Sequence, residues 1–447
     1  MIDMNSKIRY ILAVFCLIAC IVNGQTLSLD SCLSLAKKNN PQVRNAQLEI
    51  EKAQQVRYQA LTKYFPNISA QAFAFHALNP LIEIGAQDLI NSVQNEQVRT
   101  DLNQIYQDYG QNADLEKMFG FFQYGVTAGA TAIQPVFMGG QIVNGNRLAK
   151  LGVDAAKLQS EITQRDVTLD VEQLYLMIIG LEAKRSTLLS VNELLDTLTN
   201  NLKSAIAAGL TTQNDILKIE LKRGETESQQ LQLENGISLA KQALCTRIGI
   251  PFSDSLQIIT NDIFTENYTV SGADYARPEK ELLELNVQAS ELKKKMTIGQ
   301  ALPQIALGGS YAYNRMFKDK NQHNGLLFAT LKVPLTNWWE TGHKIKEYSI
   351  STEQAQNNRD YLTEQMELQT LQAEQEVMVA EKQIQINEKV VENGKENYRI
   401  AKINYDAGMV SISELLEART LLMKAENDLT DAKIQLRLAS RKAEIYR

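Results

Sequence analysis

The chain has 447 residues, a formal net charge of −6 at pH 7 and a hydrophobic share of 44%. That length could hold two or three ordinary domains, and the negative balance lacks the basic footprint that nucleic-acid binding requires. Nucleic acid is therefore not expected as a partner. With only eight prolines and 23 glycines, the sequence favours long uninterrupted elements.

The first 24 residues are predicted to be a signal peptide. Lys7 and Arg9 precede an apolar run over residues 10–22, which is short for a membrane span and lies at the very terminus. Cleavage after Gly24 would leave Gln25 first. Two alternatives stay open, namely acylation of Cys20 after cleavage, as in a lipoprotein, and retention of the segment as an anchor.

Side chains that could carry chemistry are sparse and scattered in the remaining chain. Cys32 and Cys245 flank no metal-ligand pattern and are predicted to be buried thiols, although an oxidising compartment would permit a disulfide. The three histidines, His76, His323 and His343, form no recognisable motif. We therefore expect no enzyme activity, no cofactor and no metal site.

An internal repeat divides the chain. Gly209 and Gly408 lie 199 positions apart, and each is followed by a similar helix-start pattern in which Asp215 and Glu414 correspond. The first repeat spans residues 25–250 and the second spans 278–447, with a linker over 251–277. The sequence thus predicts two copies of one structural unit.

Each repeat is predicted to end in a long helical hairpin. Residues 140–250 and 341–447 contain no proline and carry hydrophobic residues at heptad spacing. The tips are expected near Gly209 and Gly408, because a glycine followed by a capping pattern ends one helix and starts the next. By themselves, these stripes also fit an ordinary two-helix coiled coil.

Before each long hairpin, a shorter helix leads into a predicted β-hairpin, over 64–137 in the first repeat and 303–337 in the second. The strands alternate with period two. In the second repeat, one face is apolar (Ile305, Leu307, Tyr311, Leu331, Val333) and the other is polar (Gln304, Ser310, Lys332). Such strands are typical of a membrane β-barrel, and a water-soluble hairpin is the alternative.

The loops and ends of these hairpins carry further expectations. Residues 79–120 form a long polar loop, which the pattern predicts to be helical over 86–109, whereas the loop over 317–324 is short. Aromatic residues gather at one end of the strands (Tyr64, Phe65, Phe137, Trp338, Trp339). They fit an interfacial girdle or a soluble aromatic cluster.

Several segments together resemble the TolC-like outer-membrane efflux proteins. They are residues 26–30 with 39–41, the step 64–68, the segment 134–140, and the tip 405–408 with 415–419. Each segment alone is a weak motif, but their order, spacing and duplication together are specific. The resemblance covers nearly the whole mature chain. The second repeat departs over 334–342, which is three residues longer than its counterpart.

The resemblance implies a mainly α fold with a membrane β part. Three chains would form a homotrimer with a long periplasmic α-barrel and a shared β-barrel of twelve strands, four from each chain. It also implies the outer-membrane channel of a tripartite efflux or type I secretion system, which gives a passive exit route across the periplasm and the outer membrane. Its partners would be a periplasmic adaptor protein, an inner-membrane pump of the resistance-nodulation-division or ABC type, and outer-membrane lipid. The alternative is a structural coiled-coil protein of the envelope without a conduit.

The resemblance also assigns roles near the tips. Gly209, Leu210, Gly408 and Met409 are expected to contact the adaptor. Tyr405, Glu414 and Glu417 match positions near the periplasmic constriction, and their counterparts in the first repeat are Asp215 and Lys218. Threefold symmetry would bring the Glu414 and Glu417 carboxylates around one axis, where Lys218 is expected to pair with Glu417. The alternative is that Glu414 only caps a helix and Glu417 is a solvated charge.

Overall fold

The computed structural model describes residues 26–78, 82–109, 119–121, 124–207, 213–253, 256–259, 277–317 and 320–447. The predicted signal peptide, Cys20, the tip residues Gly209 and Leu210, and most of the linker lie outside these ranges. Within them, no helix has both the length and the apolar character needed to cross a membrane.

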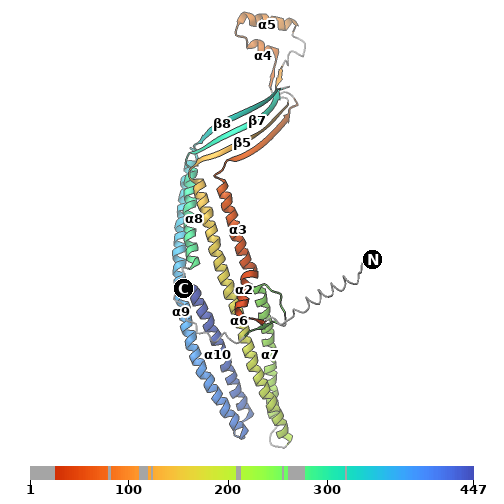
Figure 1. The fold of residues 1–447 in the computed structure, drawn as a ribbon, viewed down its shortest axis with the longest axis vertical. Helices are drawn as coiled ribbons and strands as arrows, with labels where there is room; N and C mark the ends of the chain where they lie inside the picture. The colour runs from red at the N-terminus through yellow and green to blue at the C-terminus, as the bar shows by residue number, and fades with distance from the viewer. Residues whose placement is uncertain are drawn as a thin grey trace, which may run out of the picture. The chain divides into compact units, whose positions relative to one another are not determined.

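Nine helices are present among the described residues (Figure 1). They are α2 (Leu29–Asn39), α3 (Pro41–Thr62), α4 (Ala86–Asn91), α5 (Glu96–Tyr109), α6 (Gln141–Ala207), α7 (Gln213–Ile248), α8 (Pro278–Gln300), α9 (Asn337–Asp406) and α10 (Ile412–Tyr446). Eight strands accompany them in the same ranges. They are β1 (Thr26–Leu27), β2 (Asn67–His76), β3 (Ile82–Ile84), β4 (Phe119–Phe121), β5 (Tyr124–Met138), β6 (Gln257–Ile258), β7 (Gln304–Phe317) and β8 (Lys320–Lys332).

The chain divides into two compact units, and the boundaries between them fall inside α3, α6, α8 and α9. The helix unit comprises Met1–Ala53, Val153–Val287 and Ala355–Arg447. The sheet unit comprises Gln54–Gly152 and Gln288–Gln354.

Local capping explains where α3 begins. The Asn40 side-chain oxygen accepts a hydrogen bond from the Gln42 backbone N–H at 2.7 Å, and Pro41 occupies the first helical position. Proline suits that position because its missing N–H has no intrahelical partner there. The Asn40 amide also donates to the Arg247 carbonyl at 2.8 Å, which ties the α2–α3 junction to the end of α7.

One hydrophobic core of the helix unit lies between α2, α6 and α7. Tyr175 is 1% exposed, and its hydroxyl donates to the carbonyls of Leu27 at 3.1 Å and Ile259 at 2.8 Å. These bonds hold α6 against the parallel β1–β6 pair. Cys32 and Cys245 are both free and buried in this core, as predicted. Burial and the nearby Cys245 raise the pKa of the Cys32 thiol to about 12, so that thiol is neutral at physiological pH.

An ionic cluster joins α6 to α10 in the same unit. Glu172 is 3% exposed and accepts from Arg437 at 3.0 Å, while Arg441 lies 3.4 Å from its other oxygen. A buried carboxylate needs such partners because removing an ion from water is costly. The cluster therefore fixes the contact between these two helices.

The sheet unit is built on four antiparallel strands in the order β2-β5-β7-β8. Figure 1 shows β5, β7 and β8 side by side. The sheet unit also contains a close backbone contact between Gly139 and Gly299. Gly139 has a φ of 60°, and a Cβ at that position would collide with the carbonyl of Gly299. Only glycine allows both that backbone angle and that approach.

The strand ends differ from the prediction in the second hairpin. β8 begins at Lys320, inside the loop expected over 317–324, because side chains there pair across the strands. The Tyr313 hydroxyl donates to Asn321 at 2.9 Å, and the Tyr311 hydroxyl lies 3.1 Å from His323 Nδ1. At its other end β8 stops at Lys332, so Trp338 lies in the first turn of α9, where its Nε1 donates to the Ala301 carbonyl at 2.9 Å.

The described residues in the long loop of the first hairpin differ from the prediction. The single helix expected over 86–109 is two helices, α4 and α5, separated at Ser92–Asn95. Gly85 is the N-cap residue of α4, and its backbone N–H donates a hydrogen bond to the Asp88 carboxylate at 2.9 Å. The short β3–β4 ribbon was not predicted. Three-residue strands carry too little alternation to be recognised from sequence.

Candidate functional site: the helical tip and the sheet faces

The α9–α10 turn follows directly from its glycine. Gly408 has a φ of 73°, its N–H donates to the Tyr405 carbonyl at 2.9 Å, and the Met409 N–H donates to the Asn404 carbonyl at 2.8 Å. This is the Schellman arrangement, in which a left-handed residue satisfies the last carbonyls of a helix. Met409 is 68% exposed, so the turn presents an apolar side chain to solvent.

Ser411 and Glu414 start α10 with a capping box. The Ser411 hydroxyl accepts from the Glu414 N–H at 3.4 Å, and the Glu414 carboxylate accepts from the Ser411 N–H at 3.4 Å. Glu414 therefore has the capping role that sequence analysis kept as an alternative. Glu414 and Glu417 are both exposed, and neither makes a salt bridge with any described residue.

A hydrophobic cluster near the tip joins three helices of the helix unit, α6, α7 and α10, and residues of α9 pack against it. It is formed by Val191, Leu195, Leu198, Leu202, Ile219, Ile412, Leu415 and Leu416. Tyr405 packs against this cluster. Burial, followed by the charges of Asp215 and Asp406, raises the pKa of the Tyr405 hydroxyl. Tyr405 of α9 and Ile216 of α7 pack against the same cluster, so it joins residues of both hairpins.

Lys218 has a partner within its own helix. Its ammonium lies 3.2 Å from the Asp215 carboxylate, one turn away. The resemblance implied that Lys218 would pair with Glu417 across a ring of chains. Within one chain the carboxylate at Asp215 is closer in sequence and geometry, because residues three apart on a helix share a face.

Sequence reasoning missed the role of Arg419. This arginine is 8% exposed, its guanidinium lies 5.6 Å from the centre of the Tyr398 ring, and it is 3.5 Å from the Glu426 carboxylate. The spacing Leu415, Arg419, Leu422 places it on the buried stripe of α10, which was the available signal. Arg419 links α10 to α9 just behind the turn.

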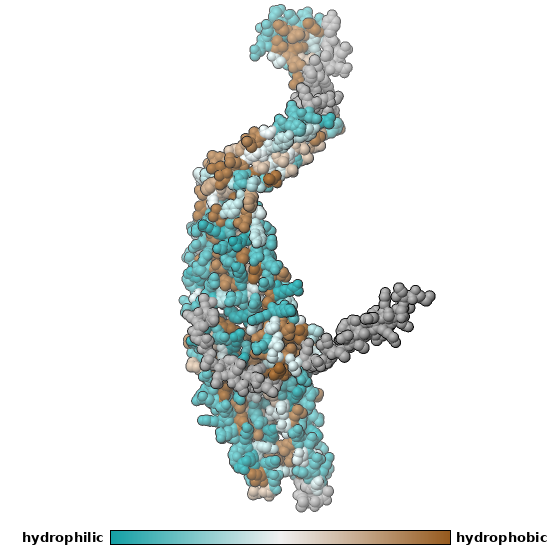
Figure 2. Space-filling view, viewed as in Figure 1, coloured by the Kyte–Doolittle hydropathy of each residue, from teal (hydrophilic) through white to brown (hydrophobic). Residues whose placement is uncertain are grey.

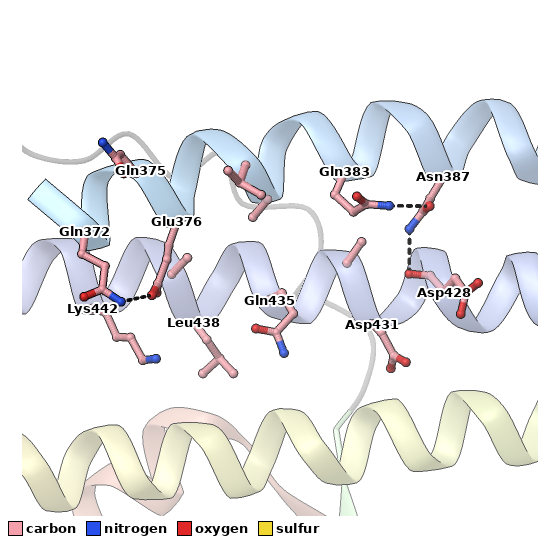
Figure 3. A pocket seen from close by; sticks show the side chains of 14 residues that line it. Gln372, Gln375, Glu376, Gln383, Asn387, Asp428, Asp431, Gln435, Leu438 and Lys442 are labelled. Atoms are coloured by element: carbon pink, nitrogen blue, oxygen red, sulfur yellow. Dashed lines mark hydrogen bonds between the residues drawn. The ribbon is translucent and has the colours of Figure 1, made fainter.

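A polar groove of about 810 Å³ runs between α9 and α10 farther from the tip (Figure 3). Asn387 spans it, accepting from Gln383 at 3.0 Å and donating to the Asp428 carbonyl at 3.0 Å. Glu376, Asp428 and Asp431 also line the groove. Among the described residues, no group of three or more His, Cys, Asp and Glu side chains is placed to hold a metal ion.

The strand register divides the sheet into an apolar face and a polar face. Ile305 pairs with Leu331, and Tyr311 pairs with Gly325 and Ala130, on the apolar face. Gln304 pairs with Lys332 on the polar face. Val333 follows the end of β8 and continues the apolar side. Figure 2 shows hydrophobic and weakly polar residues along the sheet, whereas hydrophilic residues cover much of the visible helical surface.

Residues 281–442 match the model of the family described as outer membrane efflux protein. No curated protein sequence matches the chain. The solved structures that match include a membrane protein from Pseudomonas aeruginosa, with a TM-score of 0.76 and 14% identity, covering 94% of this chain and 93% of that one.

The structures of two outer-membrane proteins match over a similar extent. The Campylobacter jejuni CmeC outer membrane channel has a TM-score of 0.73 and 15% identity, covering 93% of this chain and 86% of that one. The Vibrio cholerae outer membrane protein VceC has a TM-score of 0.71 and 16% identity, covering 93% and 96%. Because the sequence identities are so low, these structural matches establish the fold alone.

The chain therefore has the fold of the outer-membrane channels. Its second half matches the outer membrane efflux protein family over residues 281–442. The resemblance to the TolC-like outer-membrane efflux proteins that the sequence motifs indicated is confirmed.

Proposed function

We propose that this protein is the outer-membrane channel of a tripartite export system and gives cargo a passive exit route across the periplasm and the outer membrane. The observation that carries this proposal is the four-stranded sheet, which has one face rich in apolar side chains and two open edges. Among the described strands, β2 and β8 each have one hydrogen-bonded neighbour only. Open edges are not tolerated in lipid, so the sheet needs further copies to close.

A homotrimer would meet this need. β8 of one copy would pair with β2 of the next, and threefold symmetry would close a barrel of twelve strands. Members of the outer membrane efflux family are trimers that work with adaptors and inner-membrane pumps, which supports the same assembly here. Location in the outer membrane, with the long helices in the periplasm, follows from this arrangement.

The experiment is insertion of the purified full-length protein, refolded or extracted in detergent, into planar lipid bilayers. A trimer that gives discrete, voltage-independent conductance steps is expected. The alternative function, a structural coiled-coil protein of the envelope, predicts an elongated oligomer that leaves the bilayer electrically silent. Correctly assembled trimers without conductance would decide for that alternative.

The adaptor would dock at the helical tips. Met409 is exposed beside Gly408, and Gly209 and Leu210 correspond to them in the first repeat. Photo-crosslinking or cysteine crosslinking from Met409 and Leu210 in cells is expected to give adducts with a periplasmic protein encoded beside a pump. A matched cysteine at Glu388, an exposed position on α9, is expected to give no such adduct. Equal labelling from all three positions would contradict docking at the tips.

A further inference from the structure

The polar face of the sheet carries an unexpected aromatic pair. Two rows of this face are Ser69–Thr131–Ser310–Leu326 and Gln71–Gly129–Ala312–Asn324, read across the four strands. In the next row, Phe73 pairs with Thr127, which pairs with Asn314. Phe75 follows on the same side of β2, opposite Gly125. This face also carries the larger apolar side chains of Ile133, Leu326 and Phe328 among its small and polar residues. What distinguishes Phe73 and Phe75 is that they lie next to each other on the same side of one strand.

The two rings form one platform. Phe73 and Phe75 stack with centroids 5.9 Å apart and an interplanar angle of 27°. Phe75 lies across Gly125, where a Cβ would come within 2.5 Å of its ring. The missing side chain at Gly125 therefore lets the ring lie down on the sheet, and Phe73 remains 65% exposed beside it.

Polar groups border this platform. The Thr127 hydroxyl donates to the Asn314 side-chain oxygen at 3.0 Å, and Gln71 is exposed one row away on the same side of β2. The opposite face has alanines at the neighbouring positions Ala72 and Ala74, in register with Ala128 and Val126. An aromatic anchor for lipid would be expected among those residues, whereas Phe73 and Phe75 point to the other side.

We propose that Phe73 and Phe75 form a binding site on the lumen wall for flat aromatic molecules that carry a polar or cationic group. This inference rests on the proposed channel function, which makes the polar face the lumen. A flat ring would stack on the exposed Phe73, because aromatic rings favour offset stacking, and a cationic group would gain from the ring face. Thr127, Asn314 and Gln71 would contact its polar edge.

Block of ion current by a planar aromatic cation tests this site. Ethidium is applied from each side of single channels in planar bilayers, and tetraethylammonium serves as the non-aromatic cation. Three proteins are compared, namely the unmodified chain, Phe73→Leu with Phe75→Leu, and Phe73→Tyr with Phe75→Tyr. Ethidium block is expected to weaken by about tenfold in the leucine variant and to persist in the tyrosine variant. Block by tetraethylammonium is expected to be equal in all three.

The outcomes separate this inference from the function on which it rests. Assembled trimers without any conductance would reject the channel itself. Normal conductance with equal ethidium block in all three proteins would overturn the aromatic site and leave the channel intact. Loss of block in both variants would also overturn it, since the tyrosine rings retain the stacking surface. Heat-resistant trimers on gels confirm assembly of each variant.

Discussion

At Gly408 the backbone has a φ of 73°, and a Cβ built there would meet no atom within 4 Å. The demand for glycine is therefore purely conformational. At Gly139 the demand is also steric, because the backbone of Gly299 lies against it. The two positions separate the two reasons for which a fold requires glycine.

Replacing Gly408 with alanine is expected to destabilise the protein by about 1–2 kcal/mol, because the left-handed region is costly for any residue with a Cβ. Gly224 is the matched control, since it also has open space around it but lies inside α7. Gly224→Ala is expected to stabilise by about 0.5–1 kcal/mol. Melting temperatures of both variants in detergent, followed by circular dichroism, measure the difference. Shifts of the same sign would contradict the conformational argument.

Local chemistry explains which residues were predictable from sequence. The Gly408 turn and the Ser411–Glu414 capping box depend on neighbours within a few positions, so both can be recognised from the sequence. The burial of Arg419 against Tyr398 depends on the packing of α9 on α10. The pairing of Lys218 with Asp215 is also local, because the two residues lie three positions apart on one face of α7.

At the scale of elements, the absence of proline predicted the long helices, and alternation predicted the sheet faces. The strand ends were harder. β8 starts earlier than expected because Tyr313 pairs with Asn321, and Tyr311 with His323, across the hairpin. Without knowledge of these partners, the polar residues at the start of β8 indicated a loop. Period-two patterns thus identify faces better than they identify where a strand begins.

Adjacent residues on β8 offer a direct test of the faces. Leu331 lies on the apolar face opposite Ile305, and Thr330 lies on the polar face opposite Ala306. Leu331→Arg is expected to destabilise the membrane-inserted protein by about 2–4 kcal/mol if the position lies at mid-membrane depth, and Thr330→Arg much less. Urea-induced unfolding in lipid vesicles measures both. Equal tolerance of arginine at the two positions would contradict the assignment of faces.

At the scale of the whole molecule, hydrophobic packing near the tip and the Glu172 cluster each join helices from both hairpins of the helix unit. Glu172 lies on α6 and its partners Arg437 and Arg441 on α10, while Tyr405 on α9 packs against the cluster that contains Ile219 of α7. Any motion of one hairpin against the other must therefore alter these contacts. The sequence could not predict them, because they join residues more than 180 positions apart.

We propose that the assembled trimer has a cation-selective gate at the tip. Glu414 and Glu417 are exposed on the first turns of α10 and are three residues apart, so they share a face. If three copies bring this face to one axis, the carboxylates repel one another and attract cations. Tyr405, Asp215 and Lys218 would then hold the surrounding helices.

Glutamine substitutions separate this gate from simple capping. Glu414→Gln with Glu417→Gln removes both charges, while glutamine can still accept the Ser411 N–H in a capping box. We expect lower cation selectivity and about tenfold weaker block by a trivalent cation in planar bilayers, because the ring loses its charge. Glu388→Gln with Glu392→Gln, two exposed glutamates of α9, controls for net charge and is expected to leave both properties unchanged. Unaltered selectivity and block in an assembled Glu414/Glu417 variant would reject the gate and leave Glu414 as a helix cap alone.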